Sequence, residues 1–372
     1  MKKKFINVLI GATLFMSPVI FAQTEATSKS IKLGLLLDTS SSMDGLIDQA
    51  KSQLWKIINK MTSATYNGTS PNIMIALYEY GNSGLPQESG YIRKVTDLTS
   101  DLDILSRDLF SLKTNGGSEF CGQVIQTAFN DLDWSTSTND LQMIFIAGNE
   151  PFNQGKVDFK PVCQKVKNND ITINTIFCGA YQEGVNTLWK KGAELGEGEY
   201  FNIDQNEVTV YIDNPYDKVI DSLSTQLNQT YVFYGKNGKR MHLNQYEQDR
   251  NAKSYGIANN SLRAISKSSW VYDNSSWDLI DAMNQKGFDF DKIDKKTLPD
   301  SLKTLTNEAI KKELEAKAAK RAFLQAKIKK LATKREEYIA KERVIQSSKG
   351  NLDNAILVTI EKQGRSKGFE FK

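Results

Sequence analysis

One apolar run that ends in an acid and several hydroxyls, Ile31–Met43 (IKLGLLLDTSSSM), constrains the fold more than any other stretch. Residues 33–37 lack the polar alternation of a half-exposed strand, which is typical of a central parallel strand covered on both faces. Ligands bind at the carboxyl ends of such strands. Asp38, Ser40 and Ser42 follow at once, with a spacing that places three oxygens on one side of a turn. Hard oxygen ligands suit Mg²⁺ or Mn²⁺, so the sequence predicts a divalent metal site.

Three other interpretations of this motif are weaker. An aspartic protease has Asp-Thr-Gly-Ser after its apolar run and a second motif for the partner carboxylate, but here Ser40 replaces the glycine and no second motif occurs. A phosphatase of the Asp-x-Asp type requires an acid at position 40. A strand whose Asp38 and serines merely cap the next helix needs one such residue rather than three.

Composition and charge exclude several classes of function. The chain has 372 residues with a formal charge of +4, and its basic residues are interleaved with acids. No basic, aromatic-rich patch occurs, so the sequence predicts no nucleic-acid partner. His242 is the only histidine, which argues against a catalytic triad or a histidine metal site. We therefore expect a protein that is not an enzyme.

The first residues have the pattern of a secretory signal peptide. A lysine cluster, an apolar run and a small residue at Ala22 predict cleavage near Gln23, so residues 1–22 are assigned to the signal. No later segment approaches the roughly 20 apolar residues of a membrane span, so no transmembrane segment is expected after signal removal. These features predict export, to the periplasm or to the cell surface and medium.

Strand and helix patterns alternate from Ile31 to Asn228. This alternation predicts an α/β fold with a doubly wound, mostly parallel sheet. Strands are expected at 72–80, 90–98, 141–147, 171–179 and 200–203, and helices at 44–61, 101–112, 158–167, 184–195 and 217–227.

The run Asp38-Thr39-Ser40-Ser41-Ser42 after LGLLL resembles the Asp-x-Ser-x-Ser signature of von Willebrand factor A-like domains. The resemblance covers residues 30–228, and the segments GGSEFCG and GNEPFNQG are similar to those of an exported bacterial subgroup. It implies a metal-ion-dependent adhesion site. Such a site holds a divalent cation with an open position for an acidic group of a partner protein.

The resemblance also implies two further loops of the site. The turn at 114–119 contains Ser118 where the family has a threonine. The loop at 148–151 has Gly148 where the family has an acid, so Asn149, Glu150 or a water must stand in. The implied metal is Mg²⁺, with Mn²⁺ or Ca²⁺ as alternatives. The full set of implied ligands is Asp38, Ser40, Ser42, Ser118, Asn149 and Glu150.

Three cysteines in an exported chain suggest one disulfide and one free thiol. Cys121 opens the helix after the second loop and Cys178 ends a strand, so Cys121–Cys178 is the first expectation. Cys163–Cys178 is the alternative. No Cys-x-x-Cys motif occurs, which argues against a thiol catalyst.

The alternation stops after Asn228. Residues 229–298 are expected to form a polar linker and a small helical region, in which Trp270, Tyr272 and Trp277 form either its core or a sticky surface. Residues 299–372 are expected to form a C-terminal region with a long charged helix at 307–345. An imperfect heptad seam in this helix allows self-association, a hairpin folded onto the domain, or a single helix.

Three hypotheses for function follow. The first is an exported protein-binding module of the adhesion type that depends on a divalent metal. The second is a structural envelope scaffold with a degenerate, unmetallated site that acts through its long helix. The third is a metal-assisted hydrolase that uses Asp38 with Glu150 or Glu119 as the base.

Overall fold

A six-stranded sheet forms the centre of the computed structural model, which describes residues 29–203, 212–345 and 352–371. The predicted signal peptide, residues 1–22, lies outside the described residues. The strand order is β4-β3-β1-β5-β6-β7, and all neighbours are parallel except β4, which runs antiparallel at one edge. The predicted doubly wound, mostly parallel sheet is confirmed. Its strands are β1 (Ser30–Asp38), β3 (Asn72–Tyr80), β4 (Ile92–Thr99), β5 (Leu141–Gly148), β6 (Thr172–Cys178) and β7 (Glu197–Ile203).

The two central strands β1 and β5 are buried on both faces, which explains their unbroken apolar sequences. All eight residues of β5 are buried, as are the last six of β1. β1 lies between β3 and β5, because the chain winds to one side after β1 and later crosses to the other. The carboxyl ends of β1 and β5 therefore flank the point where the winding reverses, which is where open α/β sheets form a crevice for ligands.

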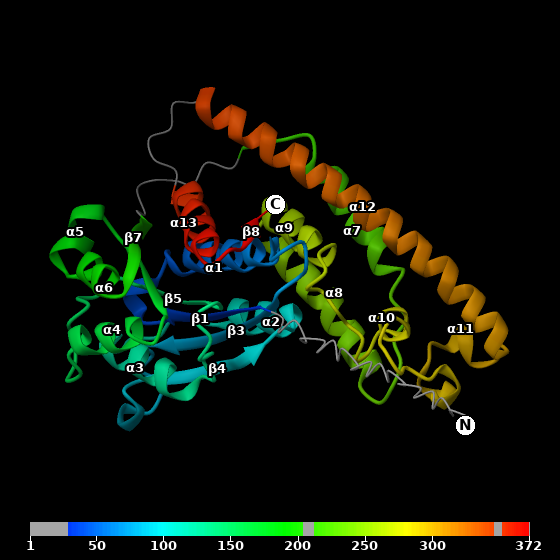
Figure 1. Ribbon diagram of the computed structural model, residues 1–372, viewed down its shortest axis with the longest axis horizontal. Helices are drawn as coiled ribbons and strands as arrows, with labels where there is room; N and C mark the ends of the chain where they lie inside the picture. Colours follow the sequence, from blue (N-terminus) through cyan, green and yellow to red (C-terminus); the bar gives the residue numbers. More distant parts are fainter. Residues whose placement is uncertain (1–28, 204–211, 346–351, 372) are drawn as a thin grey trace, which may run out of the picture.

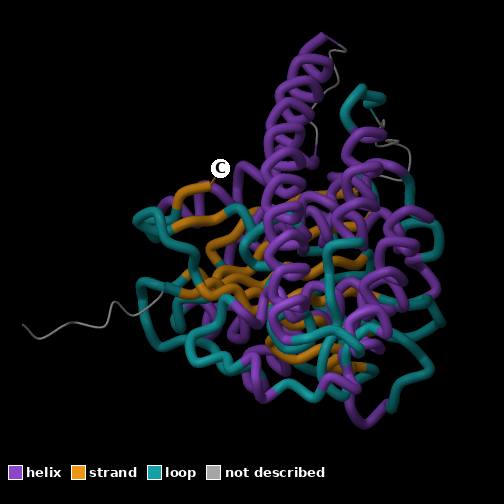
Figure 2. Tube along the Cα trace, turned by 90° about the vertical axis from the view of Figure 1, so that its right-hand side faces the viewer, coloured by secondary structure: helices purple, strands orange, loops and turns teal. Residues whose placement is uncertain are grey.

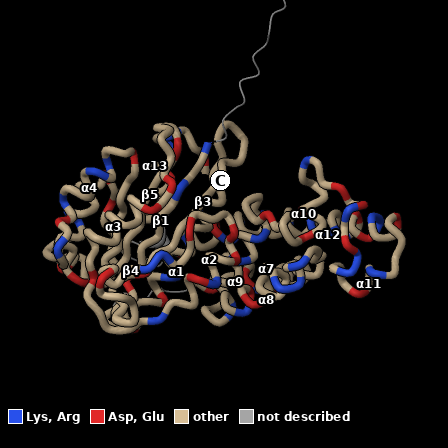
Figure 3. Tube along the Cα trace, turned by 90° about the horizontal axis from the view of Figure 1, so that it is seen from below, with Lys and Arg blue, Asp and Glu red and all other residues tan. Residues whose placement is uncertain are grey.

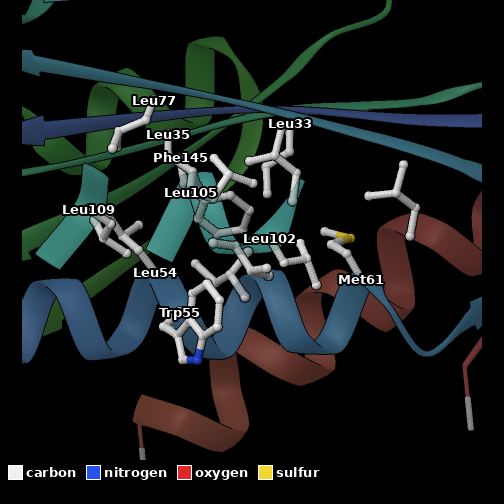
Figure 4. Close-up of a cluster of buried hydrophobic side chains, with 14 of the residues drawn as sticks. Leu33, Leu35, Leu54, Trp55, Met61, Leu77, Leu102, Leu105, Leu109 and Phe145 are labelled. Carbon is white, nitrogen blue, oxygen red and sulfur yellow. The ribbon is translucent and has the colours of Figure 1, made fainter. Parts of the chain in front are cut away.

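One face of the sheet is covered by α1 (Ile47–Met61) and α2 (Leu102–Ser111). Leu54 and Met61 of α1 and Leu105 of α2 lie in a single buried layer with the side chains of β1, β3 and β5 (Figure 4). Asp101 caps α2, since its carboxylate accepts the backbone N–H groups of residues 103 and 104. The expected helix at 44–61 begins later, after a short 3-10 turn at Ser41–Met43.

The opposite face is covered by α3 (Cys121–Asp131), α4 (Phe159–Lys167), α5 (Tyr181–Asn186) and α6 (Trp189–Leu195). The expected single helix at 184–195 is in fact α5 and α6, because Leu188 takes a left-handed conformation with φ of 72° and interrupts the helix.

The end of the chain returns to the sheet. α13 (Leu352–Ser366) packs beside α1 and β7, on the same face as α1 (Figure 1). β8 (Glu370–Phe371) pairs antiparallel with β2 (Ala64–Thr65), and Phe369 is fully buried. In the structure, the predicted C-terminal region at 299–372 therefore contains a long helix that lies away from the sheet and a terminal segment that completes one of the layers of the sheet domain (Figure 1).

Between β7 and α13 the chain forms a helical arm, defined here as α7 to α12 (Figure 1). The long helix α12 lies along α7, and one of its ends stands clear of the other helices (Figure 2). Two aromatics of the predicted cluster, Tyr272 and Trp277, are buried in the core, whereas Trp270 is partly exposed. The helices of the arm are α7 (Asp217–Asn228), α8 (Gly238–Ser254), α9 (Ile257–Lys267), α10 (Leu279–Met283), α11 (Asp300–Lys303) and α12 (Asn307–Ile345).

The apolar seam of α12 is used within the chain. Ile310, Leu314, Leu324 and Ile328 are almost fully buried, and α12 packs against α7, α9 and α10. Of the three arrangements that the heptad pattern allowed, the structure has the helix folded onto its own chain. These four positions of the seam are therefore occupied within the chain.

Buried ion pairs join the arm to the sheet domain and also link helices within the arm. The guanidinium of Arg263 on α9 contacts Asp103 on α2, and its Nε donates to Asp249 on α8 at 3.0 Å. On α12, Arg335 pairs with Asp217 of α7 at 2.6 Å. Elsewhere, basic and acidic residues are mixed along the chain, α12 included (Figure 3). These buried pairs fix how the helices meet, since a charge left without its partner there would be costly.

The structure contains neither predicted disulfide, since Cys121, Cys163 and Cys178 are all free and buried. The reason is the alternation of side chains along β6. Cys178 points into the layer under α1, whereas Cys121 and Cys163 lie in the layer under α3 and α4. Either bridge would have to cross the sheet.

Within the described ranges, no helix combines the length and the apolar character that crossing a bilayer requires.

Candidate metal site

Three loops meet at the carboxyl ends of β1, β3 and β5. The backbone N–H of Asn115 donates to the carbonyl of Thr39 at 2.9 Å, which ties the second loop to the first. Gly117 lies so close to the segment after β3 that a Cβ on it would come within 1.8 Å of the carbonyl oxygen of Gly81. Only glycine permits this approach, which explains the glycine at position 117.

Asp38 ends β1 and is completely buried. Its Oδ1 accepts the backbone N–H of Ser40 at 2.8 Å. Its Oδ2 has no hydrogen-bond partner among the described residues. A buried carboxylate oxygen without a partner is costly, so its presence points to a ligand that completes the site.

Ser40, Ser42 and Asn149 form a hydrogen-bonded chain beside Asp38. The hydroxyl of Ser42 donates to Oδ1 of Asn149 at 2.9 Å, and Nδ2 of Asn149 donates to the carbonyl of Ser42 at 3.1 Å. The two serine hydroxyls lie 2.7 Å apart. The structure thus brings four of the predicted ligands together.

The other two predicted ligands are not part of this chain of contacts. Ser118 is half-buried, and within the described part of the chain its hydroxyl makes no hydrogen bond to Asp38, Ser40 or Ser42. The backbone carbonyl of Glu150 accepts the indole N–H of Trp189 at 2.8 Å, which holds the third loop against α6. The side chain of Glu150 is half-buried.

Glu119 is the residue of the site that the sequence did not predict as a ligand. Its side chain is buried. A Cβ built on Gly81 would lie 2.8 Å from Oδ1 of Asp38 and 2.8 Å from Cγ of Glu119, so these two atoms are less than twice that distance apart. The available signal was an acid directly after Gly-Gly-Ser, but the sequence does not show which way its side chain points.

Burial raises the pKa of both carboxyl groups. The pKa of Asp38 rises to about 8, mainly through loss of solvent and further through the charge of Glu119, while the backbone N–H of Ser40 opposes the rise. The pKa of Glu119 rises to about 7 through burial and through the charge of Glu150, opposed by the Ser40 hydroxyl. Ionising both groups is therefore unfavourable without a cation, and a divalent ion would compensate for that cost.

Gly148 occupies the position of the acid that the resemblance implied. A Cβ there would come within 2.5 Å of the Tyr80 hydroxyl and 3.0 Å of both the Asp38 Cβ and the Trp189 ring. The Tyr80 hydroxyl also donates to the carbonyl of Ala147 at 3.1 Å, so the tyrosine is held in place. No acidic side chain fits at position 148.

The remaining residues fit a hard divalent cation. In the part of the chain that the structure describes, no three His, Cys, Asp or Glu side chains are grouped for metal binding, so a site here depends on hydroxyl and amide oxygens as well. Asp38, Ser40, Ser42 and Asn149 present such oxygens, and the unpartnered Oδ2 of Asp38 is a vacant acceptor among them. This donor set suits Mg²⁺ or Mn²⁺.

A known protein family matches part of this chain. Residues 33–213 match the model of the von Willebrand factor type A domain. No protein of curated function matches the chain.

Several solved structures are similar to part of the chain. BatB from Bacteroides thetaiotaomicron has 12% identity and a TM-score of 0.37, over 47% of this chain and 90% of its own. The pilus tip protein Mfa5 from Porphyromonas gingivalis has 14% identity and a TM-score of 0.36, over 49% and 92%. Proximal thread matrix protein 1 from the mussel byssus, solved with zinc in its MIDAS motif, has 11% identity and a TM-score of 0.36, over 49% and 43%.

The matched residues carry the Asp-x-Ser-x-Ser motif at the carboxyl end of the central strand of a doubly wound sheet. Residues 33–213 of this chain therefore form a von Willebrand factor type A domain.

Proposed function

We propose that this chain is an exported, non-enzymatic protein-binding module whose von Willebrand factor type A domain presents a divalent cation to an acidic group of a partner protein. The observation that carries the proposal is the unpartnered Oδ2 of the fully buried Asp38, beside the linked hydroxyls of Ser40 and Ser42. A buried polar atom of this kind is best explained by a ligand that binds there.

Asp38, Ser40, Ser42 and Asn149 would hold the cation, with Mg²⁺ as the first choice and Mn²⁺ or Ca²⁺ as alternatives. When bound, the cation supplies a Lewis acid that accepts a carboxylate oxygen. The protein's own groups fix its position: the backbone N–H of Ser40 orients Asp38, and Asn149 orients Ser42.

Ser118 and Glu150 remain proposed ligands, because Glu150 follows Asn149 in the third loop and Ser118 precedes the buried Glu119 in the second. Export, by the signal sequence at residues 1–22, and a final location in the periplasm or at the cell surface also belong to the proposal. The match of residues 33–213 to the von Willebrand factor type A domain supports a protein-interaction role.

A second candidate is a structural envelope scaffold with an unmetallated site. The observation that favours it is Gly148, where tight packing excludes the family's acid. In that case the buried ion pairs of the helical arm, such as Arg335 with Asp217, would be the functional framework. This candidate predicts that the melting temperature is the same in chelator and in Mg²⁺.

A calorimetric titration of the signal-free chain with Mn²⁺ and with Mg²⁺ tests the proposal. We expect saturable binding to the parent, a melting temperature that rises with the metal, and loss of both in Asp38→Asn. Asp44→Asn removes an exposed acid from the same loop and is the matched control, expected to bind like the parent. Absence of saturable binding to the parent would refute metal dependence and favour the scaffold.

A further inference from the structure

Gly148 leaves the site one carboxylate short of the family pattern, and the packing explains why the acid is not restored in place. The Tyr80 hydroxyl and the Trp189 ring occupy the space into which a side chain at position 148 would extend. Both residues are fully buried, and Tyr80 is held by its hydrogen bond to Ala147. A second carboxylate must therefore come from a position other than 148.

The second loop provides one. Glu119 is 4% exposed. A Cβ built on Gly81 would lie 2.8 Å from Cγ of Glu119 and 2.8 Å from Oδ1 of Asp38, so these two atoms are neighbours. Two features set this position. Gly117 packs directly on the carbonyl of Gly81, and the backbone N–H of Glu119 donates to Oε1 of Gln154 at 2.7 Å.

The Ser40 hydroxyl neighbours the carboxyl group of Glu119, but it does not neutralise its charge. Among the described residues, no lysine or arginine forms an ion pair with Glu119. The neighbouring Asp38 has the unpartnered Oδ2, which is an independent sign of a missing ligand. Two adjacent buried carboxylates without a cationic partner are the arrangement that a divalent metal ion stabilises.

We propose that Glu119 is a metal ligand, and that it replaces from the second loop the acid that Gly148 has lost from the third. This inference rests on the proposed function, because it assigns a residue to the same metal site. The second carboxylate of this site then comes from the second loop, whereas in the family pattern it comes from the third.

The test compares carboxyl-to-amide variants in the signal-free chain, with Mn²⁺ affinity measured by calorimetry and the melting temperature measured in chelator. Glu119→Gln is expected to raise the Kd for Mn²⁺ by roughly 10- to 100-fold, the range seen even for the outer partners of metal ligands. Asp44→Asn, which removes an exposed acid of the first loop, is again the matched control, with an expected change of less than about twofold. Ser118→Ala tests separately whether the hydroxyl of the preceding residue contributes to the affinity for Mn²⁺.

The outcomes separate this inference from the function on which it rests. Unchanged affinity in Glu119→Gln, together with lost binding in Asp38→Asn, overturns the role of Glu119 and leaves the metal site standing. No saturable Mn²⁺ binding to the parent overturns both. If Glu119→Gln does not fold, as its melt in chelator would reveal, Glu119→Asp decides. It keeps the charge but shortens its reach, so weaker binding supports the inference and parental affinity refutes it.

Discussion

The tight packing around Gly148 predicts that a larger residue at this position destabilises the protein. The same packing explains why this chain departs from its family. Gly148→Ala adds one methyl group that would lie 2.5 Å from the Tyr80 hydroxyl and 3.0 Å from the Trp189 ring and the Asp38 Cβ. All these groups are buried, so the added carbon cannot move toward solvent. Overpacking of this kind costs about 1–3 kcal/mol, and we expect that loss in the free energy of unfolding.

A double-mutant cycle with Tyr80→Phe isolates the closest contact. Tyr80→Phe alone removes the hydrogen bond to Ala147 and is expected to cost about 1 kcal/mol. It also removes the atom nearest to the new methyl group, so Gly148→Ala should cost less in the Tyr80→Phe background, with a coupling energy of about 1 kcal/mol. The 3.0 Å contacts remain, which is why full recovery is not expected.

The assay is urea unfolding in chelator, followed by tryptophan fluorescence and by circular dichroism. Gly116→Ala is the matched control in the neighbouring loop, because its Cβ would be 3.6 Å from the nearest atom and should be tolerated. Parental stability of Gly148→Ala, or an equal cost in the parent and in the Tyr80→Phe background, would refute the reasoning.

Three further predictions concern the arm and the C-terminus. Arg263→Met leaves Asp103 without its buried cationic partner and Asp249 with Lys267 alone, and it should lower the free energy of unfolding by about 3–5 kcal/mol; a loss under about 1 kcal/mol would show that the pairs are dispensable. Phe369→Ala should cost about 3–5 kcal/mol in the same urea assay, since the ring is fully buried, whereas parental stability would mean that the chain end does not pack on the sheet. Burial lowers the pKa of His242 below its usual 6.5, so the stability from the neutral ring is complete above pH 6.5 and lost as the pH falls through the lower, folded-state pKa. Thermal melts from pH 7.5 to 5 should show this loss, and His242→Gln should reduce it; an unchanged pH profile in the variant would contradict the assignment.

The sequence predicted the parts of the site that one strand dictates. The unbroken apolar run of β1 implies a central position, and the residues that follow it must lie at the ligand edge of the sheet. Asp38, Ser40 and Ser42 are found there, and Asn149 joins them because β5 is parallel to β1. These placements follow from strand direction alone.

The sequence could not predict that Glu119 faces Asp38, for a different reason. Its orientation depends on the close packing of Gly117 on Gly81, a contact between residues 36 positions apart that no local pattern encodes. The predicted disulfides failed for a related reason, because alternation along β6 turns Cys178 away from Cys121. To predict a disulfide, one must know which face of the sheet each cysteine points to, as well as the end of the strand at which it lies.

Local sequence patterns also do not predict that the C-terminus returns to the sheet. The amphipathic sequence of α13 predicts that one face is buried, but not that it lies beside α1. The arm of α7 to α12 separates this helix from the rest of the sheet domain in sequence. The sequence also does not predict what the seam of α12 packs against, since its leucines and isoleucines suit another chain as well as the helices on which they pack.

The central claim is that the domain offers a bound cation to a carboxylate of a partner. We would load the signal-free chain with Mn²⁺ and measure the relaxation of water protons while adding a short peptide with one glutamate, and in parallel the same peptide with glutamine. The account predicts a saturable fall in relaxation enhancement with the glutamate peptide alone, because its carboxylate displaces metal-bound water. Equal curves for the two peptides would contradict it.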